Sequence, residues 1–354
     1  MKAIQVHQFM ELPSSLQQED GVDAFLSMCD DVPKPSLKKQ QMLVRVFACS
    51  LSPGDVIMVQ GSMILMHHPF PFIPGMDICG EIVDNNGSTN FKNGDIVVAS
   101  NGMSPVGGMA EFMAINESEA VILPPGVSKE HGAASSSAIT SHNAVMENVK
   151  EGDRVLILGG SGGVGSAAIQ IAKKHAKASF VATTSTQEDM CKDLGADRVI
   201  NYKTTDWWTI EEFQRERFDV IIDCAGGRNF YGRAEKVLKT GKQGGTFVAV
   251  TAIDEAYPDC GTYWKLMKFF GTMISRVVYT KLTTRTLPNY ALLMPHDEVK
   301  ARKKVLEWME QGTLKIKFDG NSSLPFTAEG VRQAFIKVGS HHAHGKVVVT
   351  IAKE

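Results

Sequence analysis

Apolar and polar positions change their spacing along the 354-residue chain, and the first stretch follows a strand-like pattern. Up to about residue 130, short apolar runs alternate with turns that contain glycine, proline or asparagine, a pattern typical of β-structure. Residues 10–36 carry many polar side chains with little periodicity, and we interpret them as a loop. The predicted strands of this stretch are Ile4–Val6, Met42–Ala48, Asp77–Val83, Asp95–Ala99 and Glu111–Ala114.

Helical spacing begins in the alanine- and serine-rich stretch Lys129–Val149 and then alternates with further strand-like runs. The predicted strands are Val155–Leu158, Ser179–Thr184, Val199–Tyr202, Phe218–Cys224 and Gly245–Val250. The predicted helices between them are Thr186–Leu194, Thr209–Glu216 and Arg233–Leu238. This alternation predicts a parallel, doubly wound sheet of the α/β class, with right-handed crossovers.

The end of the chain returns to the first pattern. An amphipathic helix is predicted over Asp297–Gln311, and Gly345–Ile351 has the apolar composition of a buried strand. A strand that follows the completed parallel sheet needs a partner, and the β-rich N-terminal part is the natural one. We therefore predict a discontinuous first domain of residues 1–128 and 298–354, with residues 129–297 inserted as a second domain.

Composition limits the kinds of partner. The chain has 43% apolar and 21% charged residues with a net charge of −2, which gives no overall electrostatic argument for nucleic acid or an anionic membrane. Its six cysteines are scattered without a C-x-x-C motif, as expected for reduced thiols. No apolar run has the length of a membrane span, and the first residues lack a signal or transit pattern. We expect a cytoplasmic protein.

The most specific motif is a glycine-rich turn at Gly160-Ser-Gly-Gly-Val-Gly165, between a predicted strand and a predicted helix. It fits G-x-G-x-x-G, and its context is that of a dinucleotide-binding turn. We assign the tight turn to Gly160, close approach of the pyrophosphate to Gly162, and close helix–strand packing to Gly165. The alternative is a glycine-rich connector without a ligand. The predicted cofactor contacts of this turn are Gly160, Ser161, Gly162, Gly163, Val164 and Gly165.

These features together resemble a known family. The chain resembles the zinc-free medium-chain dehydrogenases/reductases, in the branch of quinone oxidoreductases and alkenal/enone reductases. The resemblance implies a GroES-like catalytic domain, a Rossmann domain, NADPH in the cleft between them, and a homodimer. The segments that carry it, besides the glycine turn, are Leu43–Val46, Leu51–Val56, Phe72–Asp77, Gly108–Phe112, Leu194–Tyr202, Asp219–Gly227 and His344–Val349.

The zinc ligands of related alcohol dehydrogenases are missing. This chain has Ser52, Met76 and a serine near Ser136 at the corresponding positions, whereas zinc requires side chains such as Cys and His. Cys49 has no other candidate zinc ligand nearby in sequence. The histidines within 67–68 and 341–344 lie in polar stretches that contain no carboxylate or cysteine to complete a metal site. We predict no metal. Without a Lewis acid to polarise a carbonyl, hydride transfer favours acceptors that can delocalise the resulting negative charge, and quinones and enones can do so.

The end of the second sheet strand bears on the choice between NADPH and NADH. An NAD site normally offers Asp or Glu there, but this chain has Thr183, Thr184 and Ser185, which suit a 2′-phosphate, and Tyr202 matches a tyrosine beside that phosphate in relatives. The basic residue that relatives place early in the next helix is absent, and Lys192 and Lys203 are the candidate substitutes. We favour NADPH. The remaining predicted cofactor contacts are Thr140, Cys224, Ala225, Thr251 and Lys346.

The proton donor is the open question of the sequence. The Ser52 hydroxyl can stabilise a developing enolate, or it can cap the turn before Pro53, while Asp55 fits a turn or helix cap better than a general acid. The predicted activity is NADPH-dependent reduction of quinones or α,β-unsaturated carbonyls. The alternatives are an enoyl-thioester reductase, disfavoured because Ile57–Leu65 contains no tyrosine, and a non-catalytic NADPH-binding interaction protein. The aromatic-rich stretch Tyr257–Tyr279 is interpreted as core or interface.

Overall fold

The structure is a computed structural model in which the chain forms two compact units. Unit 1 comprises Met1–Ser136, Asp297–Gly312 and Ile316–Glu354, and unit 2 comprises Ser137–His296 and Thr313–Lys315. The residues that the structure describes are 1–10, 25–102, 104–227, 230–240, 244–250, 260–282, 288–293 and 298–352.

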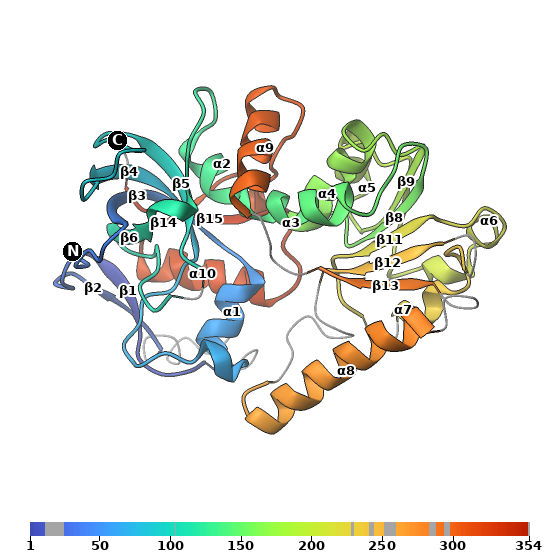
Figure 1. Cartoon of the computed structure of the whole chain (residues 1–354), viewed down its shortest axis with the longest axis horizontal. Helices are drawn as coiled ribbons and strands as arrows, with labels where there is room; N and C mark the ends of the chain where they lie inside the picture. The colour runs from blue at the N-terminus through green and yellow to red at the C-terminus, as the bar shows by residue number, and fades with distance from the viewer. Residues whose placement is uncertain are drawn as a thin grey trace. The chain divides into compact units, whose positions relative to one another are not determined.

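Unit 1 is built on a seven-stranded sheet in the order β14-β15-β3-β4-β5-β7, with β6 pairing with β3 (Figure 1). All its pairs are antiparallel except β14 with β15. The strands predicted from the N-terminal pattern are confirmed within a few residues at their ends. The bounds are β3 Gln41–Leu51, β4 Asp77–Asp84, β5 Ile96–Ser100, β6 Phe112–Asn116, β7 Ala120–Ile122, β14 Leu324–Pro325 and β15 Val347–Thr350.

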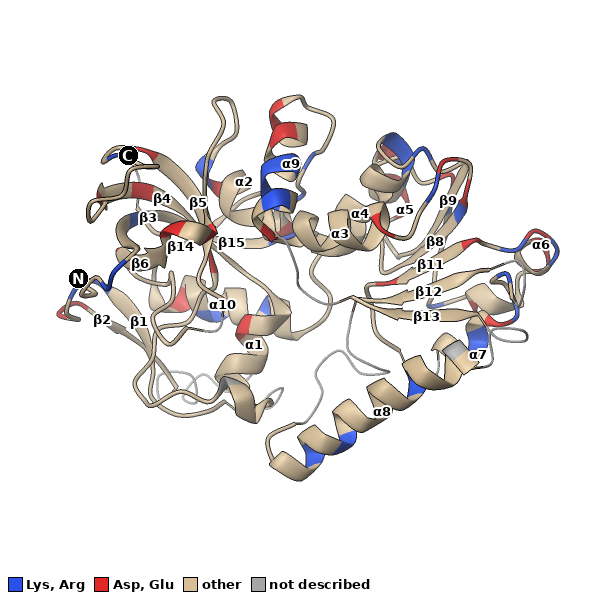
Figure 2. Cartoon of the chain, viewed as in Figure 1, with Lys and Arg blue, Asp and Glu red and all other residues tan. Residues whose placement is uncertain are grey.

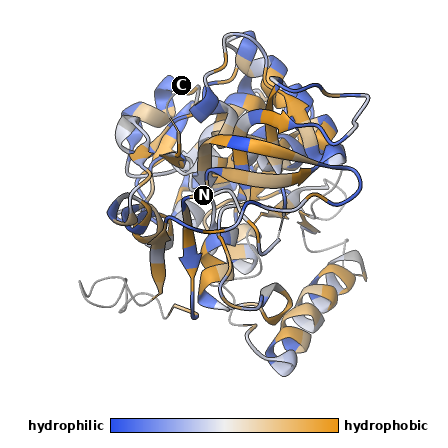
Figure 3. Ribbon diagram, turned by 90° about the vertical axis from the view of Figure 1, so that its left-hand side faces the viewer, coloured by the Kyte–Doolittle hydropathy of each residue, from blue (hydrophilic) through white to orange (hydrophobic). Residues whose placement is uncertain are grey.

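The C-terminal strand β15 lies beside the N-terminal strand β3, with Val349 opposite Cys49. The prediction that this strand finds its partner in the β-rich part of the chain is confirmed. Residues 48–51 of β3, which pair with β15, are buried, as are all but the last residue of β15, so the pairing removes apolar side chains from water on both sides of the ladder. In Figure 3 the strands of this unit are largely coloured as hydrophobic.

The interpretation of residues 10–36 as a loop is wrong in part. Residues 26–29 form β2 (Leu26–Cys29), which pairs antiparallel with β1 (Ala3–Val6) and places Ala3 opposite Cys29. Leu26 is the only residue of β2 that is fully enclosed, so the strand has little apolar signal of its own and depends on β1. Residues 11–24 of this stretch lie outside the described part.

Four α-helices accompany the sheet of unit 1 in the described ranges. The helix predicted over Asp297–Gln311 is confirmed as α9, while α1 and α10 were not predicted. The stretch Lys129–Val149 forms two helices with a junction at Ser135, so the prediction of continuous helical spacing there is only partly right. The bounds are α1 Pro53–Gln60, α2 Lys129–Ala134, α9 Glu298–Glu310, α10 Ala328–Gly339 and, at the start of unit 2, α3 Ser136–Met146.

Unit 2 contains a six-stranded, all-parallel sheet in the order β10-β9-β8-β11-β12-β13 (Figure 1). The chain starts at β8 in the middle, runs outward to β10, and then resumes on the other side with β11, as in doubly wound nucleotide-binding sheets. The predicted doubly wound sheet is confirmed. The bounds are β8 Arg154–Leu158, β9 Phe180–Thr184, β10 Arg198–Ile200, β11 Val220–Asp223, β12 Thr246–Ala249 and β13 Asn289–Leu292.

The helices of unit 2 differ from the sequence pattern at two places. The helix predicted over Arg233–Leu238 lies earlier, as α7 Phe230–Ala234. The stretch after residue 260 forms a 20-residue helix, α8 Tyr263–Leu282, on which Figure 2 marks only basic charged residues. No helix in the described ranges is both long and apolar enough to cross a membrane. The other helices are α4 Gly163–Lys174, α5 Glu188–Asp193 and α6 Glu211–Arg215.

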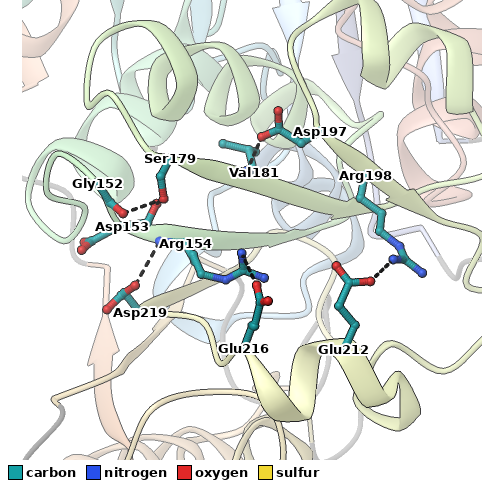
Figure 4. Close-up of polar contacts among 10 residues, drawn as sticks. All are labelled: Gly152, Asp153, Arg154, Ser179, Val181, Asp197, Arg198, Glu212, Glu216 and Asp219. Carbon is teal, nitrogen blue, oxygen red and sulfur yellow. Dashed lines mark hydrogen bonds and ion pairs between the residues drawn. The ribbon is translucent and has the colours of Figure 1, made fainter.

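Polar contacts fasten the amino ends of the strands of unit 2 (Figure 4). The Asp219 carboxylate accepts a hydrogen bond from the Arg154 backbone N–H at 3.0 Å, and the Asp197 carboxylate accepts one from the Val181 N–H at 2.7 Å. The guanidinium of Arg154 also forms an ion pair with Glu216 at 3.1 Å. These contacts satisfy strand-end N–H groups at one edge of the sheet and leave the carboxyl edge for the candidate site.

Candidate cofactor site and catalytic residues

The glycine turn joins β8 to α4 at the carboxyl edge of the sheet. Its positive φ, 85°, falls on Gly159, so the assignment of the tight turn to Gly160 is corrected by one residue. Two hydrogen bonds tie the turn to the end of β9: the Gly159 N–H donates to Thr184 Oγ1 at 2.9 Å, and the Gly160 N–H donates to the Thr184 carbonyl at 3.0 Å. The turn is therefore held in place by the neighbouring strand.

Gly160 and Gly165 stand where neighbouring atoms leave no room for a Cβ atom. A Cβ on Gly160 would lie 2.0 Å from Thr183 Oγ1, and a Cβ on Gly165 would lie 2.1 Å from the Gly159 carbonyl oxygen. The latter contact fits the expected role of Gly165, because the helix start packs directly on the turn. A Cβ on Gly162 would meet only the Gly159 oxygen, at 3.5 Å, so the fold leaves open space there.

The first turn of α4 presents backbone donors. The first helical hydrogen bond runs from the Ser166 N–H to the Gly162 carbonyl at 3.0 Å, so the N–H groups of residues 163–165 have no partner within the helix. Ser141 of α3 donates its hydroxyl to the Val164 carbonyl at 2.7 Å, and Thr140 precedes it on the same helix. Such a helix start attracts phosphate through its N–H groups and its positive dipole end.

The hydroxyls at the end of β9 already have protein partners. Thr183 donates to the Ile157 carbonyl at 2.7 Å, Thr184 accepts from Gly159, and Ser185 accepts from the Gln187 N–H at 2.9 Å. All three residues are buried. Their observed contacts hold the turn in shape.

Tyr202 lies just beyond β10, with 47% of its surface exposed. It lines a polar pocket of about 450 Å³ together with Lys203, Thr204, Thr205, Asp206 and Thr209. The other candidate cation, Lys192, forms an ion pair with Glu188 at 2.6 Å, one helical turn away. Of the two lysines, Lys203 is the one beside Tyr202.

The end of β11 completes the carboxyl edge around the glycine turn. The Cys224 N–H donates to the Leu158 carbonyl at 3.1 Å, and a Cβ on Gly159 would lie 3.2 Å from the Ala225 Cβ. Burial, followed by the charge of Asp223, raises the pKa of the Cys224 thiol, which disfavours the reactive thiolate. Thr251, also predicted to contact the cofactor, lies outside the described residues.

Asp223 is a residue whose local role the sequence interpretation missed. Its Oδ1 accepts hydrogen bonds from the Ala225 N–H at 3.1 Å and the Gly226 N–H at 3.0 Å. An aspartate followed by small residues at the end of a strand is a sequence signal for such a turn. The carboxylate therefore shapes the backbone that passes next to Gly159.

In unit 1, Ser52 and Asp55 form the start of α1. The Asp55 carboxylate accepts hydrogen bonds from the Ser52 N–H at 2.8 Å, the Ser52 hydroxyl at 3.0 Å and the Met76 N–H at 3.0 Å. Asp55 is fully buried. Burial, and to a lesser extent the negative charge of Asp77, raises the pKa of Asp55 to about 6. The hydrogen bonds from Ser52 act in the opposite direction, because they stabilise the ionised carboxylate. Asp55 is thus a helix-start acid, as the sequence suggested.

Lys346 lies in the same buried cluster, directly before β15. Its ammonium donates to the Leu51 carbonyl at 3.1 Å and to Ser136 Oγ at 3.2 Å, and the residue is 5% exposed. Burial lowers the pKa of Lys346, while Asp77 and Asp55 oppose the change. Its described hydrogen bonds are therefore to unit 1 itself.

Ser52, Met76 and Ser136, which stand at or near the positions that the resemblance aligns with zinc ligands, all contact members of this cluster. Ser52 and Met76 both contact Asp55, and Ser136 contacts Lys346. These positions supply hydroxyls and a thioether where zinc would need thiolate or imidazole. Across the described ranges, no group of three or more His, Cys, Asp or Glu side chains is placed to hold a metal ion.

Comparison with known proteins agrees with this architecture. A family described as "Alcohol dehydrogenase GroES-like domain" matches residues 38–125, and one described as "Zinc-binding dehydrogenase" matches residues 194–349. The quinone oxidoreductase of Coxiella burnetii superposes with a TM-score of 0.79 at 25% identity, with 99% of each chain covered. The Escherichia coli quinone oxidoreductase complexed with NADPH has the same fold, with a TM-score of 0.74 at 19% identity over 99% of this chain and 100% of the other.

Two curated relatives are similar over most of their length. The chloroplastic quinone-oxidoreductase QR1 of Triphysaria versicolor is 31% identical over 333 residues, which cover 90% of this chain and 92% of the relative. The chloroplastic NADPH-dependent alkenal/one oxidoreductase of Arabidopsis thaliana is 28% identical over 340 residues, covering 93% and 76%. A GroES-like part combined with a doubly wound nucleotide sheet defines a class of two-domain dehydrogenases. This chain belongs to the medium-chain dehydrogenase/reductase family, in the branch that contains the quinone and alkenal/one oxidoreductases.

Proposed function

We propose that the chain is an NADPH-dependent oxidoreductase that reduces quinones or α,β-unsaturated carbonyl compounds by hydride transfer without zinc. The observation that carries this proposal is the glycine turn at the point where the strand order of unit 2 reverses, between β8 and β11. Ligands of doubly wound sheets bind at this point. The names of the relatives, which include quinone and alkenal/one oxidoreductases, support the acceptor class.

The cofactor would be held by the start of α4 and the strand ends around it. The N–H groups of Gly163, Val164 and Gly165 would bind the pyrophosphate, and the open space at Gly162 would let it approach the backbone. The hydroxyls of Thr183 and Thr184 would act through the turn that they support. When bound, NADPH supplies the hydride.

We propose that Tyr202 and Lys203 give the preference for NADPH over NADH. Their pocket combines a phenol, a lysine and three threonines, and cations with hydroxyls suit a 2′-phosphate. Lys192 is a weaker candidate because it is already paired with Glu188. Asp206, which also lines the pocket, would oppose a phosphate and so limits the expected preference.

Ser52 is proposed to support the acceptor side of the reaction. Its hydroxyl hydrogen bonds to Asp55 at 3.0 Å, so the protonation state of this carboxyl decides where the hydroxyl proton points. When Asp55 is ionised it accepts that proton, and when Asp55 is protonated the Ser52 hydroxyl is free to donate to a developing enolate oxygen. Solvent or the cofactor ribose remains an alternative source of the proton.

The remaining features are also proposals. Unit 1 would be the catalytic domain and unit 2 the NADPH domain, with boundaries near those of the two compact units. A homodimer is proposed from the family resemblance, and β13 has a strand on one side only within the described ranges. A cytoplasmic location is proposed from the scattered free cysteines, which suit a reducing compartment; two of the compared relatives are named as chloroplastic.

The direct test is NADPH oxidation followed by absorbance with a quinone, an alkenal and a 2-enoyl-CoA, with NADH in parallel. We expect turnover of the quinone or the alkenal, NADPH preferred, and no loss after dialysis against a chelator. A 2-enoyl-CoA that outcompetes both would make the chain an enoyl-thioester reductase. Tight NADPH binding without turnover of any acceptor would point to the non-catalytic interaction protein.

A further inference from the structure

Helix α8 carries an exposed apolar stripe along its whole length. Of the thirteen large apolar side chains that are exposed in the described part of the chain, eight lie on this one helix. Large exposed apolar areas on a soluble fold mark a binding surface. The stripe residues recur at intervals of three or four, which places them on one face, and they are Tyr263, Met267, Phe270, Ile274, Val278 and Leu282.

A different side of α8, about 110° around the helix from the stripe, anchors the helix to its own unit. Leu266, Met273 and Thr280 recur every seven residues and are 7%, 8% and 1% exposed, and the helix packs on β13. Arg276 faces the same side, with its guanidinium 5.5 Å from the ring centre of Tyr290. The side of α8 that packs on unit 2 is therefore not the stripe. A partner that covers the whole stripe would have to lie along the axis of the helix.

The charge of α8 selects the kind of partner. The helix has three lysines and one arginine and no acidic residue, whereas the whole chain has a net charge of −2. Lys268 is exposed and stands one helical turn from Trp264, which is 76% exposed beside the stripe. Aromatic and aliphatic side chains on one face with a lysine at its edge fit the composition of helices that lie in the surface of an anionic bilayer.

We propose that α8 binds the surface of an anionic lipid bilayer, with its axis in the membrane plane and the stripe inserted among the lipid headgroups. A helix of 20 residues offers an apolar line of about 30 Å. A second copy of this chain is disfavoured as the occupant, because pairing two α8 helices would bring like charges together. The proposal concerns a surface of unit 2 and does not depend on the proposed reaction.

The test uses the full chain with vesicles of phosphatidylcholine, alone or mixed with phosphatidylglycerol. We expect flotation only with the anionic vesicles, weaker in high salt, together with a blue shift of tryptophan emission and quenching by brominated lipid. Trp264 would dominate that change, because it is 76% exposed, whereas Trp207 and Trp308 are 2% and 5% exposed and Trp208 is half-buried against the core of unit 2. Ile274→Asp should lower vesicle binding about tenfold or more, and Lys268→Gln should lower it less and reduce the salt dependence.

The matched control is Ile122→Asp, the same change at an exposed isoleucine of β7, which should leave vesicle binding unchanged. Thermal unfolding and NADPH binding establish that the variants are folded, and lipid quenching of the unmodified chain tests the proposal without any variant. Absence of flotation and of quenching in the unmodified chain would overturn the proposal. Self-association in solution that Ile274→Asp abolishes, without vesicle binding, would assign the stripe to a second copy instead.

Discussion

Thr183 touches Gly160 so closely that a Cβ at position 160 would lie 2.0 Å from its Oγ1. The same hydroxyl donates to the Ile157 carbonyl at 2.7 Å, so it cannot turn away without losing that bond. Gly160→Ala should therefore destabilise the protein by about 1–3 kcal/mol, as overpacking does, and weaken NADPH binding. Chemical denaturation of the cofactor-free protein and a binding titration measure the two effects.

Gly162→Ala is the control for this prediction, because its added methyl would meet only one backbone atom, at 3.5 Å. It should leave the stability of the cofactor-free protein within about 0.5 kcal/mol and still weaken NADPH binding, since the methyl group would stand where the pyrophosphate approaches. Equal losses of stability in the two variants would show that the Thr183 contact is not what makes glycine necessary at position 160.

Lys203→Ala should weaken NADPH binding about tenfold, because it removes a charged hydrogen-bond donor to the 2′-phosphate, and should leave NADH binding unchanged. The comparison is Lys192→Ala, which loses only an exposed ion pair with Glu188 and should alter neither cofactor. Affinities for both cofactors, measured by fluorescence titration, give the answer. An equal effect of Lys203→Ala on NADPH and NADH would remove this residue from 2′-phosphate recognition.

The sequence predicted best those parts of the fold whose signals are local. The run of β8, the glycines and the first residues of α4 follow one another within about twenty residues, and each spacing rule applies directly. The shift of the positive φ from Gly160 to Gly159 is not a local signal. It depends on where the end of β9 meets the turn, which a single sequence does not specify.

Helix α8 was not predicted, because its apolar residues were interpreted by composition and not by spacing. Met267, Phe270 and Ile274 follow one another at helical intervals, and Leu266 and Met273 stand seven residues apart on the buried side. Which of these apolar residues are exposed depends on how the helix packs on β13, and a single sequence does not specify that. The composition of this stretch was interpreted as core or interface, and its exposed half stays a candidate interface.

The cluster around Lys346 could not be derived from spacing either. Its ammonium contacts Leu51 and Ser136, which lie 295 and 210 residues away in the chain. The resemblance led to the prediction that Lys346 contacts the cofactor, and this stays a prediction. A buried lysine surrounded by carbonyl and hydroxyl partners is a feature of the three-dimensional packing alone.

Ser52→Ala separates the two roles that the sequence left open for this serine. If its hydroxyl stabilises the enolate, kcat for an alkenal should fall about 10²- to 10³-fold, alongside a loss of about 1–2 kcal/mol of stability from the bond to Asp55. Ser128→Ala is the control, since Ser128 caps α2 by accepting from the His131 N–H and should cost about 1 kcal/mol without changing kcat. An unchanged kcat in Ser52→Ala would leave the hydroxyl a structural partner of Asp55 only.

Asp55→Asn should change how stability depends on pH. Burial raises the pKa of Asp55 from 3.8 to about 6, so the folded state binds this proton more tightly than the unfolded state does. The resulting stabilisation is fully present below the unfolded pKa and is lost as the pH rises through about 6, which amounts to at most about 3 kcal/mol. Asparagine has no such proton.

The quantity to measure is the unfolding free energy of the unmodified protein minus that of Asp55→Asn, by denaturant titration from about pH 4 to pH 7. This difference should decrease steadily across the range, whatever fixed cost asparagine adds by placing its amide beside the N–H donors of Ser52 and Met76. A flat difference for Asp55→Asn would mean that Asp55 binds its proton equally in both states, and the Asp55-dependent switching of the Ser52 hydroxyl would then lose its basis.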